Sequence, residues 1–118
     1  MSMKKDKANS VGLDKDGRND LINAVIDDNL EVIKKQLKIG VDIDLQDNDG
    51  LAALHFASQD FNEKVIELLL KNKANPNVRD KHGNTPIYKA LFNSKGKKTK
   101  IFNLFKAKGG DATIKNNY

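Results

Sequence analysis

The chain has 118 residues, a length that fits one domain of about 100 residues and is short for an enzyme with two lobes around a cleft. It contains no Cys and two His, which excludes a disulfide framework, a thiolate nucleophile, and metal sites built from Cys or from three His. The net charge of +5 is unevenly distributed along the chain. Residues 1–60 carry 8 basic and 12 acidic side chains, whereas residues 61–118 carry 13 basic and 4 acidic side chains. This charge dipole favours an oriented partner surface.

The N-terminal residues 1–13 are basic, with Lys4, Lys5 and Lys7, and they lack the apolar segment of a secretory signal. We expect them to form a flexible segment ahead of a folded domain over residues 14–118. No apolar run approaches the roughly 18 residues that a membrane span requires. The sequence therefore predicts a soluble cytoplasmic protein.

A pattern with a period of 33 residues runs through residues 14–118. A glycine that follows Asp or His recurs at Gly17, Gly50 and Gly83. The same spacing links two further sets, Leu21, Leu54 and Ile87, and Ala24, Ala57 and Ala90. Such a period is the signature of a repeat architecture, in which each unit buries its apolar face against its neighbours.

Each copy predicts the same elements in chain order. A glycine-containing turn is followed by a short helix with a small Ala at its middle, a polar break, and a second helix with apolar residues at helical spacing. Gly40 and Gly109-Gly110 mark the ends of two of the second helices. The third copy is three residues longer, and the extra residues fall in Asn93–Lys100, which we predict to be a loop between two helices.

At this point the sequence resembles the ankyrin repeat family. The resemblance rests on Asp47-x-x-Gly50-x-x-x-Leu54-His55-x-Ala57, on Val65-Ile66-x-Leu68-Leu69-Leu70, and on Asp80-x-x-Gly83-x-Thr85-Pro86-Ile87. It implies an all-α solenoid of stacked helix-turn-helix units joined by short hairpin-like turns. The repeats would span about 14–46, 47–79 and 80–115.

The first copy departs from the family pattern. Asn19-Asp20 replace Thr-Pro, and Lys35-Gln36 replace two leucines. We interpret this copy as a polar N-terminal cap, because a terminal repeat has one face in water. At the other end two alternatives stay open. Either a further repeat follows, or the third copy is itself the cap and exposes part of the apolar set Ile101, Phe102, Leu104 and Phe105.

No group of residues predicts catalysis, a cofactor or a metal. His55 occupies the position where the family carries a histidine, and we expect it to be structural. Asp44, Asp47 and Asp49 superficially resemble a calcium loop, but the EF-hand needs a Glu six residues after its Gly, and position 56 is Phe. Gly96-Lys97-Lys98-Thr99 lacks the upstream glycine and strand of a phosphate-binding loop. We expect a protein that is not an enzyme.

The resemblance implies that partners contact the turn tips and the exposed face of the first helix of each repeat. Leu51, Phe61 and Phe92 are candidate anchors, with packing between repeats as the alternative. The full candidate set is Lys15, Asp16, Arg18, Asn48, Asp49, Leu51, Gln59, Asp60, Phe61, Lys81, His82, Asn84, Tyr88, Phe92 and Asn93.

A run of lysines between residues 95 and 108 is a second candidate site. It contains Lys95, Lys97, Lys98 and Lys100, followed by Lys106 and Lys108, with no acidic residue among them. Three interpretations stay open, namely a solvated loop, a docking patch for an acidic protein, and a nucleic-acid contact. The chain has two arginines and no interleaving of aromatic and basic residues, which argues against nucleic acid.

The leading functional hypothesis is a non-enzymatic protein-protein interaction module. Residues 83–96 resemble the late repeats of small stand-alone bacterial ankyrin proteins, some of which are immunity proteins that bind and neutralise a toxin. A generic adaptor or host-directed effector is the alternative. Binding of an anionic surface or nucleic acid through the C-terminal lysines is a second alternative.

Overall fold

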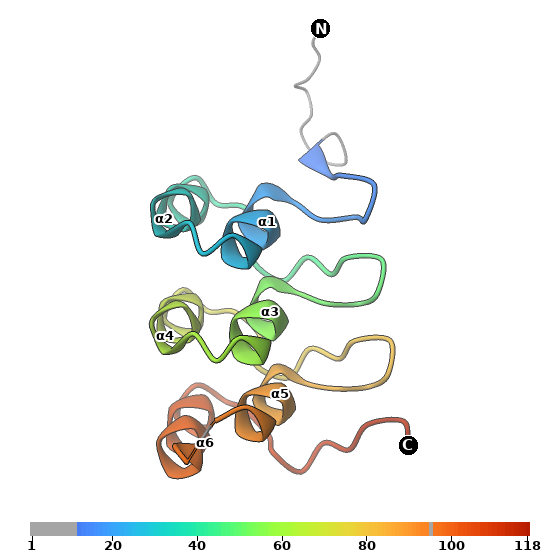
Figure 1. The fold of residues 1–118 in the computed structure, drawn as a ribbon, viewed down its shortest axis with the longest axis vertical. Coiled ribbons are helices and arrows are strands. Elements are labelled where there is room, and N and C mark those ends of the chain that lie inside the picture. Colours follow the sequence, from blue (N-terminus) through green and yellow to red (C-terminus); the bar gives the residue numbers. More distant parts are fainter. Residues whose placement is uncertain (1–11, 95) are drawn as a thin grey trace, which may run out of the picture.

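The computed structural model describes residues 12–94 and 96–118, and these residues contain six α-helices and no strand. The helices form three consecutive pairs, which we call repeats 1, 2 and 3. Figure 1 shows the first helix of each pair in one column, the second helix in another, and the connecting loops projecting to one side. The bounds are α1 Asp20–Ile26, α2 Leu30–Lys38, α3 Ala53–Gln59, α4 Glu63–Lys71, α5 Pro86–Phe92 and α6 Lys98–Ala107.

Polar residues that precede the apolar positions determine where most helices begin. The side-chain oxygens of Asn19, Asn29, Asn62 and Thr85 each accept a hydrogen bond from the backbone N–H three residues later. Each bond satisfies one of the amide groups that a helix leaves unpaired at its first turn. The helices α3 and α6 have no such cap at Ala52 and Lys97.

Buried apolar rows run along the stack and hold the repeats together. Ala24, Ala57 and Ala90 are at most 4% exposed, and their small side chains allow the three first helices to pack closely. Leu21, Leu54 and Ile87 form a second buried row at the same 33-residue spacing. Burial of a large aliphatic side chain stabilises the fold by about 1.5–3 kcal/mol, so these rows supply much of the cohesion between repeats.

The second residue after the end of each second helix adopts a left-handed backbone conformation. Glycine occupies this position at Gly40 and Gly109, with φ of 83° and 90°, whereas repeat 2 has Lys73 with φ of 71°. A side chain in this region costs about 1 kcal/mol relative to glycine. We therefore expect Lys73→Gly to raise the free energy of unfolding by 0.5 to about 1 kcal/mol. Urea unfolding followed by circular dichroism tests this, and a loss of stability would contradict it.

The loop predicted over Asn93–Lys100 is three residues too long, because α6 begins at Lys98. The helical hydrogen bonds of α6 already start at Lys97, because its carbonyl accepts the Ile101 N–H at 3.1 Å. Ile101 and Phe105 lie four residues apart and are both fully buried, which requires helix one turn before Ile101. Of the large apolar residues in α6, only Phe102 is exposed, at 38%.

Candidate functional site

Three aspartates at 33-residue intervals give the projecting loops the same shape. One carboxylate oxygen of Asp14, Asp47 and Asp80 accepts two backbone N–H groups, two and four residues later, all at 2.9 Å. These carboxylates are therefore turn formers. No cluster of three or more metal-ligating side chains occurs within residues 12–94 and 96–118.

Backbone hydrogen bonds join each loop to the next one. The N–H of Asn48 donates to the carbonyl of Asp16 at 2.9 Å, and that of Lys81 donates to the carbonyl of Asp49 at 3.0 Å. The C-terminal residues continue the series, since the Asn117 N–H donates to the His82 carbonyl at 2.9 Å. The loops are thus fixed in register along the stack.

The exposed side chains of the loops form a strip of polar and charged residues, which we call the tip strip. Lys81 Nζ lies 2.9 Å from Asp49 Oδ1, and this contact lowers the pKa of Asp49 and raises the pKa of Lys81. His82 Nδ1 lies 2.7 Å from the hydroxyl of Tyr118. The tip strip consists of Lys15, Asp16, Asn48, Asp49, Lys81 and His82.

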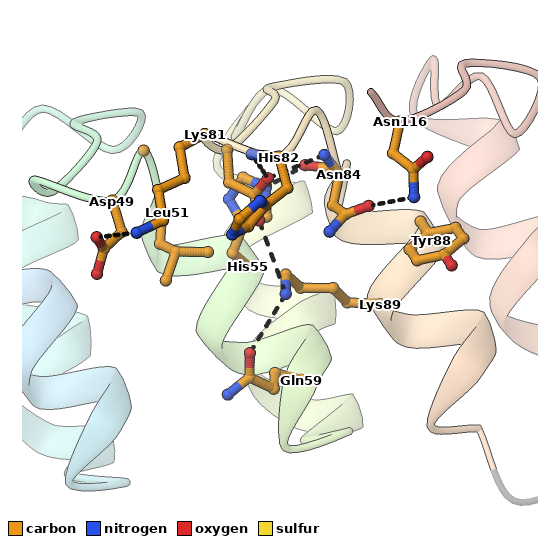
Figure 2. A network of polar contacts seen from close by, with 12 residues as sticks. Asp49, Leu51, His55, Gln59, Lys81, His82, Asn84, Tyr88, Lys89 and Asn116 are labelled. Carbon is orange, nitrogen blue, oxygen red and sulfur yellow. Dashed lines mark hydrogen bonds and ion pairs between the residues drawn. The ribbon is translucent and has the colours of Figure 1, made fainter. Parts of the chain in front are cut away.

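Behind the tips lies a second surface, which we call the floor. In repeat 2 the guanidinium of Arg18 covers the Phe56 ring at 5.3 Å from its centroid, while its Nε lies 3.2 Å from the buried Asp47 carboxylate. In repeat 3 the Lys89 amine lies 3.8 Å from Asp80 and 3.4 Å from Gln59 (Figure 2). The floor consists of Arg18, Asn23, Leu51, Phe56, Asn84 and Lys89.

Sequence reasoning missed three floor residues, and a signal for them exists. Asn23, Phe56 and Lys89 each follow the loop aspartate by nine residues. Asn23 and Lys89 contact the second carboxylate oxygen of their own aspartate, at 3.1 and 3.8 Å. Phe56 cannot pair with a carboxylate, so Asp47 takes Arg18 from repeat 1 instead. Comparing the three copies at this position would have placed all three side chains on one surface.

His55 is fully buried and connects repeats 2 and 3. Its Nδ1 accepts the Ala52 N–H at 3.0 Å, so the proton resides on Nε2, which donates to the Asn84 carbonyl at 2.9 Å. Burial is the main cause that lowers the pKa of His55. Both ring nitrogens are satisfied only in the neutral form, because a second ring proton would face the Ala52 N–H.

Stability is expected to fall as the pH drops below the unfolded-state pKa of histidine, about 6.5. The unfolded chain then binds a proton that the folded chain resists, so the full contribution of His55 is present above that pH and is lost below it. The slope reaches at most about 1.4 kcal/mol per pH unit. Urea unfolding between pH 8 and pH 5 measures it. A His82→Asn variant should retain the slope and a His55→Gln variant should lose it; the reverse outcome would contradict the assignment.

The other candidates from the first helices lie at three different places. Phe61 is half-buried, packs against the core and has φ of 50°. Gln59 and Asp60 are exposed near the end of α3, and the half-buried Asn93 donates to the Lys89 carbonyl at 2.9 Å. Tyr88 and Phe92, which are 49% and 81% exposed, line a pocket of about 300 Å³ at the end of the stack.

The lysine run is partly neutralised within the chain. Lys97 Nζ and Lys100 Nζ lie 2.8 and 2.7 Å from the two carboxylate oxygens of Glu63 in α4, and both contacts lower the pKa of Glu63. Lys98 points elsewhere and lines the pocket beside Phe92. Lys95 lies outside the described residues. The pairs join repeat 3 to repeat 2, so a role in stacking accounts for two of the lysines.

Stacked helix pairs with loops held in register define a repeat solenoid. A family model described as "Ankyrin repeats (3 copies)" matches residues 21–116. The chain belongs to the ankyrin repeat family, whose repeats mediate protein-protein interaction and are themselves non-enzymatic.

Similar proteins come from several kingdoms. The chain is 42% identical over 96 residues to inversin of Canis lupus familiaris, which covers 81% of this chain and 9% of that protein. It is 38% identical over 65 residues to SH3 and multiple ankyrin repeat domains protein 2 of Homo sapiens, 55% of this chain and 4% of the relative. A putative ankyrin repeat protein of Rickettsia bellii is 38% identical over 56 residues, 48% of this chain and 16% of the relative. The chain thus spans a small part of each.

Among the helices of the described residues, none combines the length and the hydropathy that crossing a bilayer demands.

Proposed function

We propose that the chain binds another protein through the tip strip and the floor. The observation that carries this proposal is the centre of the floor, where Arg18 covers the Phe56 ring and the Asp47 carboxylate binds both Arg18 and the backbone N–H of the half-buried Leu51. Aromatic and arginine side chains dominate the energetics of protein interfaces when a partner removes them from water. The charged side chains of the tip strip lie at the edge of the floor, and such charges favour the correct orientation of a partner.

The proposal is tested by affinity capture from cells of the source organism, followed by mass spectrometry and a titration with the purified partner. Leu51→Asp places a charge at the centre of the floor and is expected to weaken binding at least about tenfold. Lys38→Glu, on the exposed face of α2, is the control and should bind like the wild type. Circular dichroism verifies that both variants fold. A partner that binds Leu51→Asp with unchanged affinity would refute the proposed surface.

A narrower form of the proposal is that the partner is a toxin, which the chain would neutralise as an immunity protein or inhibitor. Its support is the resemblance of residues 83–96 to small bacterial ankyrin proteins. An adaptor or host-directed effector would form the complex and leave the partner active. Measuring the activity of the captured partner with and without the chain separates these forms. If the wild-type chain inactivates the partner and Leu51→Asp does not, the inhibitor form is supported. If the partner keeps its full activity in the complex, the inhibitor form is excluded.

A further inference from the structure

The end of the stack formed by repeat 3 exposes aromatic side chains, and the exposure is specific to this end. Tyr88 of α5 occupies the position of the fully buried His55, and it is 49% exposed. Phe102 of α6 occupies the position of the fully buried Ile66, and it is 38% exposed. A position that is buried in repeat 2 and exposed in repeat 3 faces the next unit along the stack. Figure 2 shows Tyr88 on the side of α5 that faces away from α3.

Of these two aromatics, Tyr88 lines a shallow pocket of about 300 Å³, to which Phe102 does not contribute. Its lining is mostly apolar, and Phe92, at 81%, is its most exposed large side chain. We call Tyr88, Phe92, Phe102 and this pocket the C-terminal face. The pocket is lined by Thr85, Ile87, Tyr88, Leu91, Phe92, Lys98, Ala112 and Ile114.

The opposite end of the stack has a different composition. Asp20 and Gln36 of repeat 1 occupy the positions of Ala53 and Leu69, which are both fully buried in repeat 2. Asp20 is exposed and Gln36 is half-buried. The end at repeat 1 therefore presents polar side chains to water, as a terminal repeat does, whereas the C-terminal face presents aromatic ones.

The surroundings of the C-terminal face are cationic. Lys98 lines the pocket, and the Lys106 amine lies 5.6 Å from the centroid of the Phe102 ring. Within the described residues, no carboxylate lies within 4.0 Å of Lys98, Lys106 or Lys108. Lys97 and Lys100 share the Glu63 carboxylate, whereas Lys98 and Lys106 add positive charge beside the pocket and the Phe102 ring.

We propose that the C-terminal face binds an acidic amphipathic helix of another protein. Such a helix lies over α5, as α3 lies over α1 and α5 lies over α3 within the chain. Its apolar side covers Tyr88, Phe92 and the pocket, and its carboxylates reach Lys98 and Lys106. Aromatic side chains that are largely exposed give such a groove most of its binding energy once a partner covers them.

A second copy of this chain fits the face less well. Two copies joined through the same face would bring Lys98 and Lys106 against their own equivalents, which like-charge repulsion opposes. A head-to-tail arrangement would lay the polar Asp20 and Gln36 over Tyr88 and Phe102. It would therefore bury polar groups against aromatic rings without hydrogen-bond partners.

The probe for this proposal is a phage-displayed library of 16-residue helical peptides, selected against the 118-residue chain. We expect enrichment of amphipathic sequences with net negative charge. Synthetic copies should bind Phe92→Asp/Phe102→Asp at least about tenfold more weakly than the wild type. Lys98→Glu/Lys106→Glu should weaken them at low salt and flatten the dependence on salt. Leu51→Asp, on the floor, should leave this binding unchanged, which separates the two surfaces.

Three outcomes would overturn the proposal. These are no enrichment, enriched peptides without acidic residues, and peptides that bind the aromatic variant as tightly as the wild type. If the double variant fails to fold, Phe92→Ser takes its place in the test. This variant is expected to fold, because Phe92 is 81% exposed and makes little contact with the core. A selection that Leu51→Asp abolishes would place the peptide on the floor and would also refute a site at the C-terminal face.

Discussion

Gly50→Ala is expected to lower the free energy of unfolding by about 3 kcal/mol, because it combines backbone strain with a collision between loops. Gly50 has φ of 80°, which side chains with a Cβ rarely adopt. A Cβ at this position would lie 2.8 Å from the Lys81 backbone nitrogen and 2.9 Å from the Asp80 Cα. Neither atom belongs to a flexible side chain, so the loop of repeat 3 has to move away. Urea unfolding followed by circular dichroism measures the loss.

Gly40→Ala is the matched control for this substitution. Gly40 has nearly the same φ, 83°, but no atom lies within 4 Å of a Cβ built on it. It therefore reports the backbone cost alone, about 1 kcal/mol. Equal losses for the two variants would show that contact between loops adds nothing to stability.

Asp47→Ala is also expected to lower the free energy of unfolding, by about 3 kcal/mol. Its carboxylate, whose side chain is 1% exposed, accepts the N–H groups of Asp49 and Leu51 and the Nε–H of Arg18. Alanine would leave these donors without their partner, and the Arg18 guanidinium would lose the buried counter-charge of Asp47. Thermal and urea unfolding give the loss, and the salt dependence of unfolding reports the charge contribution.

The repeat symmetry supplies the control for Asp47. Asp14 forms the same two backbone hydrogen bonds in repeat 1, but it is exposed, so water replaces its contacts when it is removed. Asp14→Ala should therefore destabilise the chain much less than Asp47→Ala. Similar losses at both positions would mean that burial and the Arg18 contact contribute little.

Much of the fold was predictable because the chain repeats itself. The 33-residue spacing of Gly17, Gly50 and Gly83 and the alanine row identified the loops and the first helices, and the apolar spacing identified the second helices. The family and the all-helical fold are confirmed. The start of α6 was misplaced by three residues, since a cluster of lysines suggests a loop when the register of the buried Ile101 and Phe105 is left out.

The candidate site was harder to predict, for a physical reason. Two of the pairs that shape it join residues from different repeats, Arg18 with Asp47 and Lys81 with Asp49. Their formation depends on which long side chain reaches across the stack, and residue type alone does not reveal this. Tyr88 and Phe92 were grouped with the loop tips because their helix also borders the floor. Tyr88 is exposed at the position where His55 is buried, and this comparison shows that Tyr88 faces the end of the stack and not the floor.

The hydrogen bonds between successive loops have a consequence for sequence change. They join backbone atoms, Asn48 to Asp16 and Lys81 to Asp49, so they do not depend on which side chains occupy these exposed positions. The spacing of the loops is thus set by the backbone, and the chemistry of the tip strip is set by its side chains. We therefore expect substitutions in the tip strip to change the chemistry of the proposed binding surface while the scaffold keeps its shape. The backbone therefore fixes where the loop side chains are displayed, and their identity remains free to change.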